Sequence, residues 1–96
     1  MEGIGSDVMT EALHPDVIDK VITASDADAF ATARQLARQE GILSGGSSGA
    51  AVWAARQLAP QLDQSALMVV ILPDTGAKYL SKCFNDEWMK QQSFNV

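Results

Sequence analysis

The apolar residues of the chain fall into segments with two different periodicities. Residues 17–23 are rich in β-branched side chains, and residues 67–72 are apolar at every position, as in a strand covered on both faces. Residues 42–44 (ILS) are too few to classify by periodicity. The pattern therefore predicts strands over residues 17–23 and 67–72, with residues 42–44 as a candidate third strand.

Helical periodicity is clearest in residues 26–40, where apolar side chains recur every three or four positions and form one buried stripe. Ser25 has the hydroxyl expected of an N-cap, and Gly41 is the expected C-terminal stop. The sequence also predicts a helix over residues 50–58 and one or two short helices over residues 79–89.

If residues 42–44 form a strand, the order of elements is β-α-β-α-β-α. Right-handed crossovers then give an α/β fold, a parallel sheet with helices on its faces. Residues 45–49 and 73–76 both follow predicted strands, so we expect both loops at the carboxyl-terminal edge, where ligands bind in open α/β sheets. The length of 96 residues predicts one domain with a small core, because a chain of this size buries only roughly 60–65% of its unfolded surface.

Composition excludes several classes of protein. The formal net charge of −5 disfavours a nucleic-acid binder, and the longest apolar run, residues 67–72, is far shorter than the ~20 residues that a bilayer requires. The N-terminal residues do not resemble a secretory signal. A single cysteine, Cys83, cannot form an internal disulfide, which predicts a cytoplasmic protein. With one His and one Cys, no metal site is expected, and the hydrophobic fraction of 47% predicts an ordered fold.

The strongest local signal for chemistry is residues 44–49 (SGGSSG), which lead into the second predicted helix. Glycines let the backbone approach a ligand closely, and the first N–H groups of a helix favour an anion or an acceptor atom. The loop has neither the ending of a Walker loop nor the GxGxxG spacing. Two interpretations stay open from these residues alone: a phosphate-type site, or a tight turn in which Ser47 or Ser48 only caps the helix.

The remaining candidates are weaker. Asp74 and Thr75 lie in a turn that follows a predicted strand, where contact with a ligand and ordinary exposure are about equally expected. Cys83 lies in a helix-like segment and is expected to be packed rather than nucleophilic. The large aromatic side chains, among them Phe30 and Trp88, are expected in the core or at an interface.

Three ordered blocks of the sequence resemble one enzyme family. They are residues 2–5 (EGIG), residues 40–51 (EGILSGGSSGAA) and residues 69–76 (VVILPDTG), the last followed by KYLS. In this order they resemble the C-terminal part of the catalytic core of the cysteine synthase and cystathionine β-synthase family. These are pyridoxal-phosphate enzymes of fold type II, the fold of the tryptophan synthase β subunit. Residues 85–89 (NDEWM) favour the cystathionine β-synthase branch over the O-acetylserine sulfhydrylase branch.

The resemblance implies a role for each block. Ser47, beside Gly46, would contact the pyridine nitrogen of pyridoxal phosphate, and Asp74 and Thr75 would lie in a turn near that nitrogen. Gly3, Ile4 and Gly5 would form the loop on the substrate side. A neutral hydroxyl at the ring nitrogen makes the ring a milder electron sink than a carboxylate partner would. Such a sink suits elimination and replacement at the Cβ atom of the amino-acid substrate.

The family's Schiff-base lysine and phosphate loop belong to an upstream part of the family sequence. The family resemblance therefore implies that residues 1–96 form a single partial domain. None of Lys20, Lys78, Lys82 and Lys90 lies in the context of that lysine. Catalysis through an imine needs a desolvated lysine beside the cofactor. We therefore predict that this chain has no catalytic residue of its own, binds pyridoxal phosphate weakly or not at all in isolation, and is inactive alone.

Three functional hypotheses follow from the sequence. The first is a piece of a β-replacement enzyme that joins L-serine, or an activated serine, to a thiol or sulfide, with a complementing chain segment completing the site. The second is a catalytically silent α/β module whose exposed sheet edge and apolar surface mediate self-association. The third, a small anion-binding domain, is disfavoured because the three blocks occur in the family's order.

Overall fold

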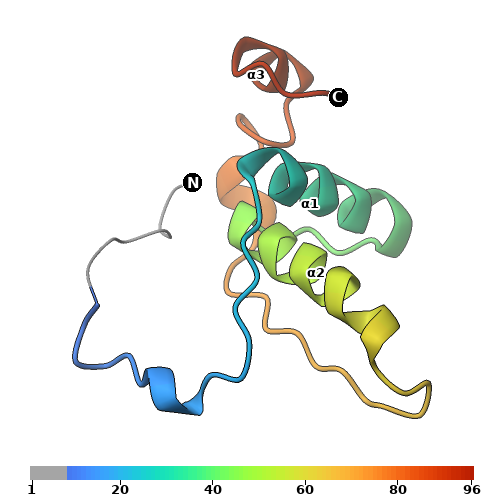
Figure 1. Ribbon diagram of the computed structural model, residues 1–96. Coiled ribbons are helices and arrows are strands. Elements are labelled where there is room, and N and C mark those ends of the chain that lie inside the picture. The colour runs from blue at the N-terminus through green and yellow to red at the C-terminus, as the bar shows by residue number, and fades with distance from the viewer. Residues whose placement is uncertain (1–8) are drawn as a thin grey trace.

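The computed structural model describes residues 9–96, so the predicted substrate loop at residues 3–5 lies outside the described residues. Two long helices lie side by side, and a shorter helix follows near the C-terminus (Figure 1). One short 3-10 helix precedes the first long helix, and two more lie between the second long helix and the C-terminal helix. The elements in order are η1 (Pro15–Val17), α1 (Asp26–Glu40), α2 (Gly46–Leu58), η2 (Ala59–Gln61), η3 (Gly76–Tyr79) and α3 (Asp86–Gln91).

Helix α1 confirms the helix predicted over residues 26–40, including both of its caps. The Ser25 hydroxyl accepts a hydrogen bond from the backbone N–H of Asp28 at 3.1 Å, as an N-cap should. Gly41 ends the helix in the left-handed conformation with φ of 68°, and its N–H donates to the Ala37 carbonyl at 3.2 Å. Both ends of α1 are therefore determined by residues adjacent to them in the sequence.

Helices α1 and α2 pack closely because small residues meet at their contact. Ala29 and Ala33 of α1 are fully buried, and Gly49 of α2 lies against them. A Cβ atom on Gly49 would be 2.0 Å from the Ala29 carbonyl oxygen and 2.9 Å from the Ala33 Cβ atom. Only glycine at this position allows the two backbones to approach so closely.

Helix α2 begins at Gly46, earlier than the predicted start at residue 50. Gly45 is the N-cap residue, with extended backbone and no side-chain cap hydrogen bond. Ser47 and Ser48 are therefore helical residues of the first turn, and the interpretation that one of them caps the helix is wrong. The glycines and serines before residue 50 were expected in a turn, but the contact of Gly49 with α1 holds them in the helix.

The predicted parallel sheet is not formed by the part of the chain that the structure describes. Residues 9–96 contain no β-strand, and their one β-bridge joins Ser44 to Thr75 in antiparallel orientation. Residues 17–23 begin at the end of η1, and residues 67–72 have no regular secondary structure. A strand requires a partner for its backbone groups, and no neighbouring strand accompanies these two segments within the described residues.

The two extended segments nevertheless lie along α2. Ile22 lines a groove together with residues 68–71 and the side of α2. Alternate residues of the second segment face opposite ways: Met68 and Val70 are half-buried, whereas Val69 is 76% exposed. Residues 67–72, predicted to be covered on both faces, are thus covered on one face in this chain.

The C-terminal segment packs on α1 through aromatic rings and one arginine. The Phe30 ring makes edge-to-face contacts with Trp88 at 5.6 Å and with Phe94 at 5.2 Å between ring centroids. Arg34 donates to the Cys83 carbonyl oxygen at 2.9 Å and pairs with the Asp86 carboxylate. Phe30 and Trp88 were expected in the core or at an interface; they pack against each other but are only half-buried, and these contacts hold the C-terminal segment against α1.

Candidate cofactor site at the start of helix α2

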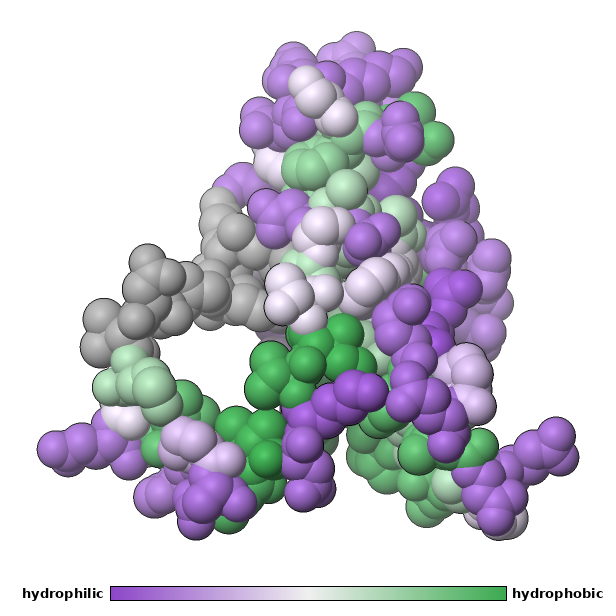
Figure 2. Space-filling view, viewed as in Figure 1, coloured by the Kyte–Doolittle hydropathy of each residue, from purple (hydrophilic) through white to green (hydrophobic). Residues whose placement is uncertain are grey.

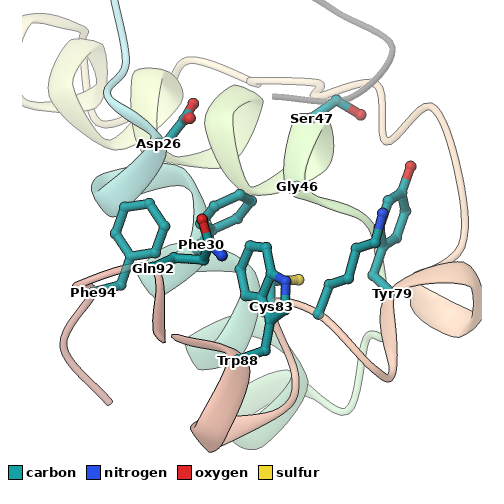
Figure 3. A pocket seen from close by; sticks show the side chains of 10 residues that line it. Asp26, Phe30, Gly46, Ser47, Tyr79, Cys83, Trp88, Gln92 and Phe94 are labelled. Carbon is teal, nitrogen blue, oxygen red and sulfur yellow. The ribbon is translucent and has the colours of Figure 1, made fainter. Parts of the chain in front are cut away.

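A cavity of about 250 Å³ opens where the N-terminus of α2 meets the start of α1 and the C-terminal segment (Figure 3). Its apolar part is formed by aromatic rings and a cysteine, and its polar part by the first residues of α2 and several side chains around them. The lining residues are Asp26, Phe30, Gly46, Ser47, Tyr79, Lys82, Cys83, Trp88, Gln92 and Phe94.

Two of the predicted cofactor residues, Gly46 and Ser47, lie in this cavity. Gly46 is buried, and Ser47 is half-buried with its hydroxyl pointing away from the rings of Phe30 and Trp88 (Figure 3). No hydrogen bond engages the Ser47 hydroxyl among residues 9–96. The first turn of α2 contains no acidic residue, so its free N–H groups and the positive end of the helix dipole are available to an acceptor atom.

Asp74, the third predicted residue, lies behind the start of α2 and does not line the cavity. The Tyr79 hydroxyl donates to its Oδ2 atom at 2.8 Å, and its Oδ1 atom is buried without a hydrogen-bond partner. The carboxylate lies against Gly45, because a Cβ atom built there would be 2.2 Å from Asp74 Oδ1. Asp74 is therefore joined to the cavity through Tyr79 and through the backbone of Gly45.

The structure places the Thr75 side chain elsewhere. Its hydroxyl accepts a hydrogen bond from the Ala77 N–H at 3.3 Å and caps η3. Its backbone forms the bridge to Ser44, and the neighbouring Gly76 N–H donates to the Leu43 carbonyl at 3.0 Å. Thr75 thus contributes its backbone to the attachment between residues 43–45 and residues 74–76, while its hydroxyl is outside the cavity lining.

Sequence reasoning missed several lining residues. Tyr79 belongs to the family block KYLS. Its position shortly after the PDTG turn was the one sequence signal that could have placed it near the site. Lys82 and Gln92 had no distinguishing motif, because they reach the cavity only through the packing of the C-terminal segment. Ser48, which follows Ser47 in α2, does not line the cavity. It is fully buried, and its Oγ atom has no hydrogen-bond partner among the described residues.

Cys83 forms part of the apolar wall and is 1% exposed, which confirms the expectation that it is packed. Desolvation by burial raises the pKa of its thiol, and the nearby positive charge of Arg34 offsets only part of that increase. The thiol is therefore neutral near pH 7 and behaves as a small apolar group.

The described part of the chain has neither a metal-binding cluster nor a membrane-spanning helix. No group of three or more His, Cys, Asp and Glu side chains is arranged to hold a metal ion. No helix there combines the length and the apolar character needed to cross a membrane.

Comparison with known proteins decides the family. A family model described as "Pyridoxal-phosphate dependent enzyme" matches residues 1–74. The chain belongs to this family. Within it, the chain is 46% identical to cystathionine β-synthase of Mus musculus and 45% identical to that of Apis mellifera, each over 94 residues. These matches cover 98% of this chain but only 17% and 19% of the relatives, so the chain spans less than a fifth of their length.

A solved structure supports the same relationship. A crystal structure of O-ureido-L-serine synthase with bound O-ureido-L-serine is 34% identical, with a TM-score of 0.71. It covers 88% of this chain, which covers 29% of that protein. The likeness supports the fold-type-II family for this chain.

The residues at the start of α2 fit the family's cofactor. A pyridine nitrogen is an acceptor, and the half-buried Ser47 hydroxyl is a donor with no partner among the described residues. Gly46, which lines the cavity, has no side chain to obstruct a planar ring approaching the first turn. The cofactor, when bound, supplies an electron sink, and the protein sets its electronic character through such contacts.

Proposed function

We propose that this chain forms the pyridine-side wall of the cofactor pocket in a pyridoxal-phosphate-dependent β-replacement enzyme of the cystathionine β-synthase or cysteine synthase type. The substrates would be L-serine or an activated serine, together with a thiol or sulfide. The observation that carries the proposal is the position of Ser47, in the first turn of α2 at the cavity and with no competing hydrogen-bond partner among residues 9–96. The similarity to cystathionine β-synthase over 98% of the chain supports it.

In this proposal the chain's own residues tune the ring nitrogen. The Ser47 hydroxyl donates one hydrogen bond and has no charge with which to hold a proton on the nitrogen. The positive end of the α2 dipole also disfavours a cationic ring at this place. Both effects keep the ring a moderate electron sink, which suits loss and replacement of a substituent at Cβ. The apolar wall of Phe30 and Trp88 keeps water away from one side of the cavity.

The test is Ser47→Ala in the full-length gene product loaded with pyridoxal phosphate. Loss of one hydrogen bond of about 1–1.5 kcal/mol should raise the cofactor Kd roughly tenfold and change the absorption and fluorescence of the bound cofactor. The matched control is Ser65→Ala, which removes an exposed hydroxyl far from the cavity lining. If Ser47→Ala and Ser65→Ala have the same Kd and spectrum, the assignment of Ser47 is wrong.

A second candidate function, self-association, is favoured by the uncovered side of residues 67–72. Leu67, Val69 and Ile71 are 90%, 76% and 74% exposed on a segment without strand pairing in the described chain. Apolar side chains on an unpaired extended segment favour pairing with the same segment of a second copy. The occupant proposed for this surface is therefore another molecule of this chain.

We expect Val69→Lys to shift the purified chain toward the monomer in sedimentation velocity, because the charge must be desolvated in the pairing. Val96→Lys is the matched control, since Val96 is also exposed, at 56%, and lies outside this segment. A wild-type chain that sediments as a monomer at all concentrations tested would exclude the self-association function.

A further inference from the structure

Tyr79 and Asp74 form a side-chain pair that lies against Gly45, the N-cap residue of α2. The Tyr79 hydroxyl donates to Asp74 Oδ2 at 2.8 Å in a partly buried position. Tyr79 also lines the cavity together with Gly46 and Ser47. The pair therefore connects the wall of the cavity to the N-cap residue of α2. In Figure 3 the Tyr79 ring lies on the side of the cavity toward which the Ser47 hydroxyl points.

The pair makes close contact with the backbone at the N-cap. A Cβ atom on Gly45 would be 2.2 Å from Asp74 Oδ1 and 2.7 Å from Tyr79 Cε2. Both distances are far below ordinary van der Waals contact, so the carboxylate and the phenol ring lie directly on Gly45. The N-cap residue of α2 is thus held by side chains from the segment that contains η3.

Backbone contacts also join the segment before α2 to the segment that contains Asp74. Ser44 and Thr75 form the β-bridge, and the Gly76 N–H donates to the Leu43 carbonyl at 3.0 Å. These bonds fix where residues 74–76 cross the chain before α2, but they do not reach the first turn itself. The side chains of Asp74 and Tyr79 are the groups that extend this attachment to Gly45.

The second carboxylate oxygen of Asp74 indicates that the pair does more than pack. Its Oδ1 atom is buried and has no hydrogen-bond partner in the part of the chain that the structure describes. A buried carboxylate oxygen without a donor is unfavourable, and it is tolerated best beside the positive end of a helix. Asp74 Oδ1 lies against Gly45, the N-cap residue of α2, and no side chain caps the N–H groups of the first turn that follows. The carboxylate therefore acts on the same helix start that presents Ser47.

We propose that Tyr79 and Asp74 are positioning residues for Ser47. The inference rests on the proposed function, in which Ser47 contacts the cofactor ring. Tyr79 orients the Asp74 carboxylate, the carboxylate holds Gly45 and the first turn of α2, and the first turn fixes the Ser47 hydroxyl. Asp74 thus acts through the helix start rather than by touching the ring.

The decisive experiment is a double-mutant cycle between Tyr79→Phe and Ser47→Ala in the full-length gene product loaded with pyridoxal phosphate. Tyr79→Phe removes only the hydroxyl, so we expect the cofactor Kd to rise about three- to tenfold and its fluorescence to shift in the direction seen for Ser47→Ala. In the Ser47→Ala background, Tyr79→Phe should have no further effect on either quantity. Full additivity of the two changes overturns the positioning role.

Asp74 supplies a second, independent test. Asp74→Asn keeps an acceptor oxygen for the Tyr79 hydroxyl and should preserve most of the cofactor affinity, whereas Asp74→Ala should lose as much as Tyr79→Phe. Asp63→Asn is the matched control, because Asp63 is exposed and outside the cavity lining. Thermal unfolding of each variant identifies any that fail to fold, and Tyr79→Phe, which removes only one hydroxyl, decides if Asp74→Ala does not fold.

The outcomes separate this inference from the function on which it rests. If Ser47→Ala itself leaves the cofactor Kd and spectrum unchanged, the proposed function fails. If Ser47→Ala has its expected effect but Tyr79→Phe and Asp74→Ala match Asp63→Asn, only the positioning inference fails. An equal loss for Asp74→Asn and Asp74→Ala also contradicts it, because the hydrogen bond from Tyr79 would then not be the active contact.

Discussion

Two glycines of residues 44–49, the N-cap residue Gly45 and Gly49 within α2, are required for different contacts. Gly45 lies under the Asp74 carboxylate and the Tyr79 ring, at the site. Gly49 lies against the backbone of Ala29, in the contact between α1 and α2. The family block SGGSSG therefore combines a requirement of the site with a requirement of packing, and both arise because a Cβ atom would overlap other atoms.

Gly49→Ala is expected to destabilise the chain. Alanine is about 1 kcal/mol better than glycine within a helix. Against this, the new Cβ atom would lie 2.0 Å from a carbonyl oxygen, and forcing the helices apart costs typically 1–3 kcal/mol or more. We expect the steric cost to dominate, with a net loss of about 1–2 kcal/mol in urea unfolding. An unchanged or higher unfolding midpoint would show that α1 and α2 separate without cost.

Burial of Cys83 makes the stability of the chain depend on pH. Burial raises the pKa of its thiol above the ordinary 9.0, so the folded chain holds this proton to higher pH than the unfolded chain. The contribution to stability is therefore fully present below pH 9.0 and is lost as the pH rises toward the folded pKa. We expect an aromatic disulfide reagent to react with Cys83 slowly at pH 8 and quickly in urea. Equal rates in the two conditions would contradict burial of the thiol.

At the scale of elements, the attachment of α3 depends on Arg34 of α1. The Arg34 side chain is 12% exposed and bonds to the Cys83 carbonyl, whereas its ionic partner Asp86 is 62% exposed. An ion pair with one exposed member contributes less than about 1 kcal/mol. The hydrogen bond to the carbonyl of a buried residue is therefore the larger part of this contact.

This difference can be measured by substitution. We expect Arg34→Gln to destabilise the C-terminal segment by about 1–2 kcal/mol and Asp86→Asn by less than about 1 kcal/mol. Fluorescence of Trp88 in a Trp53→Phe background would report the loss as the aromatic contacts with Phe30 open. A larger effect for Asp86→Asn than for Arg34→Gln would show that the ion pair is the dominant contact.

The helices differ in how far the sequence predicts them. The bounds and caps of α1 were predicted correctly, because Ser25 and Gly41 act on backbone groups within a few residues of themselves. The start of α2 was predicted too late, because Gly46, Ser47 and Ser48 are residues that locally favour turns. Packing against α1 overrides that local preference and places Ser47 in the first turn.

At the scale of the whole molecule, apolar surface is distributed unevenly. Most of the green, hydrophobic surface lies in the lower part of Figure 2, at the opposite end of the view from α3. Among the exposed apolar residues are Val17 at the end of η1 and Val21 after it, at 74% and 80%, and Leu67, at 90%. Surfaces of this kind in ordered proteins mark interaction sites, which is consistent with the self-association proposed above. The single partial domain and the cytoplasmic compartment remain predictions.

The sequence alone determined the family, because each of the three motif blocks is a short continuous run of residues. It also determined the local structure of α1, because a helical period and two caps depend on residues close in the chain. Tertiary structure decided the rest. Residues 17–23 and 67–72 have the composition of strands, but a strand forms only when a second strand pairs with its backbone. The cavity depends likewise on Phe30, Ser47 and Tyr79, which are distant in sequence and meet only through packing. The role of Tyr79 could therefore be seen only once its hydroxyl was found on Asp74, against the first turn of α2.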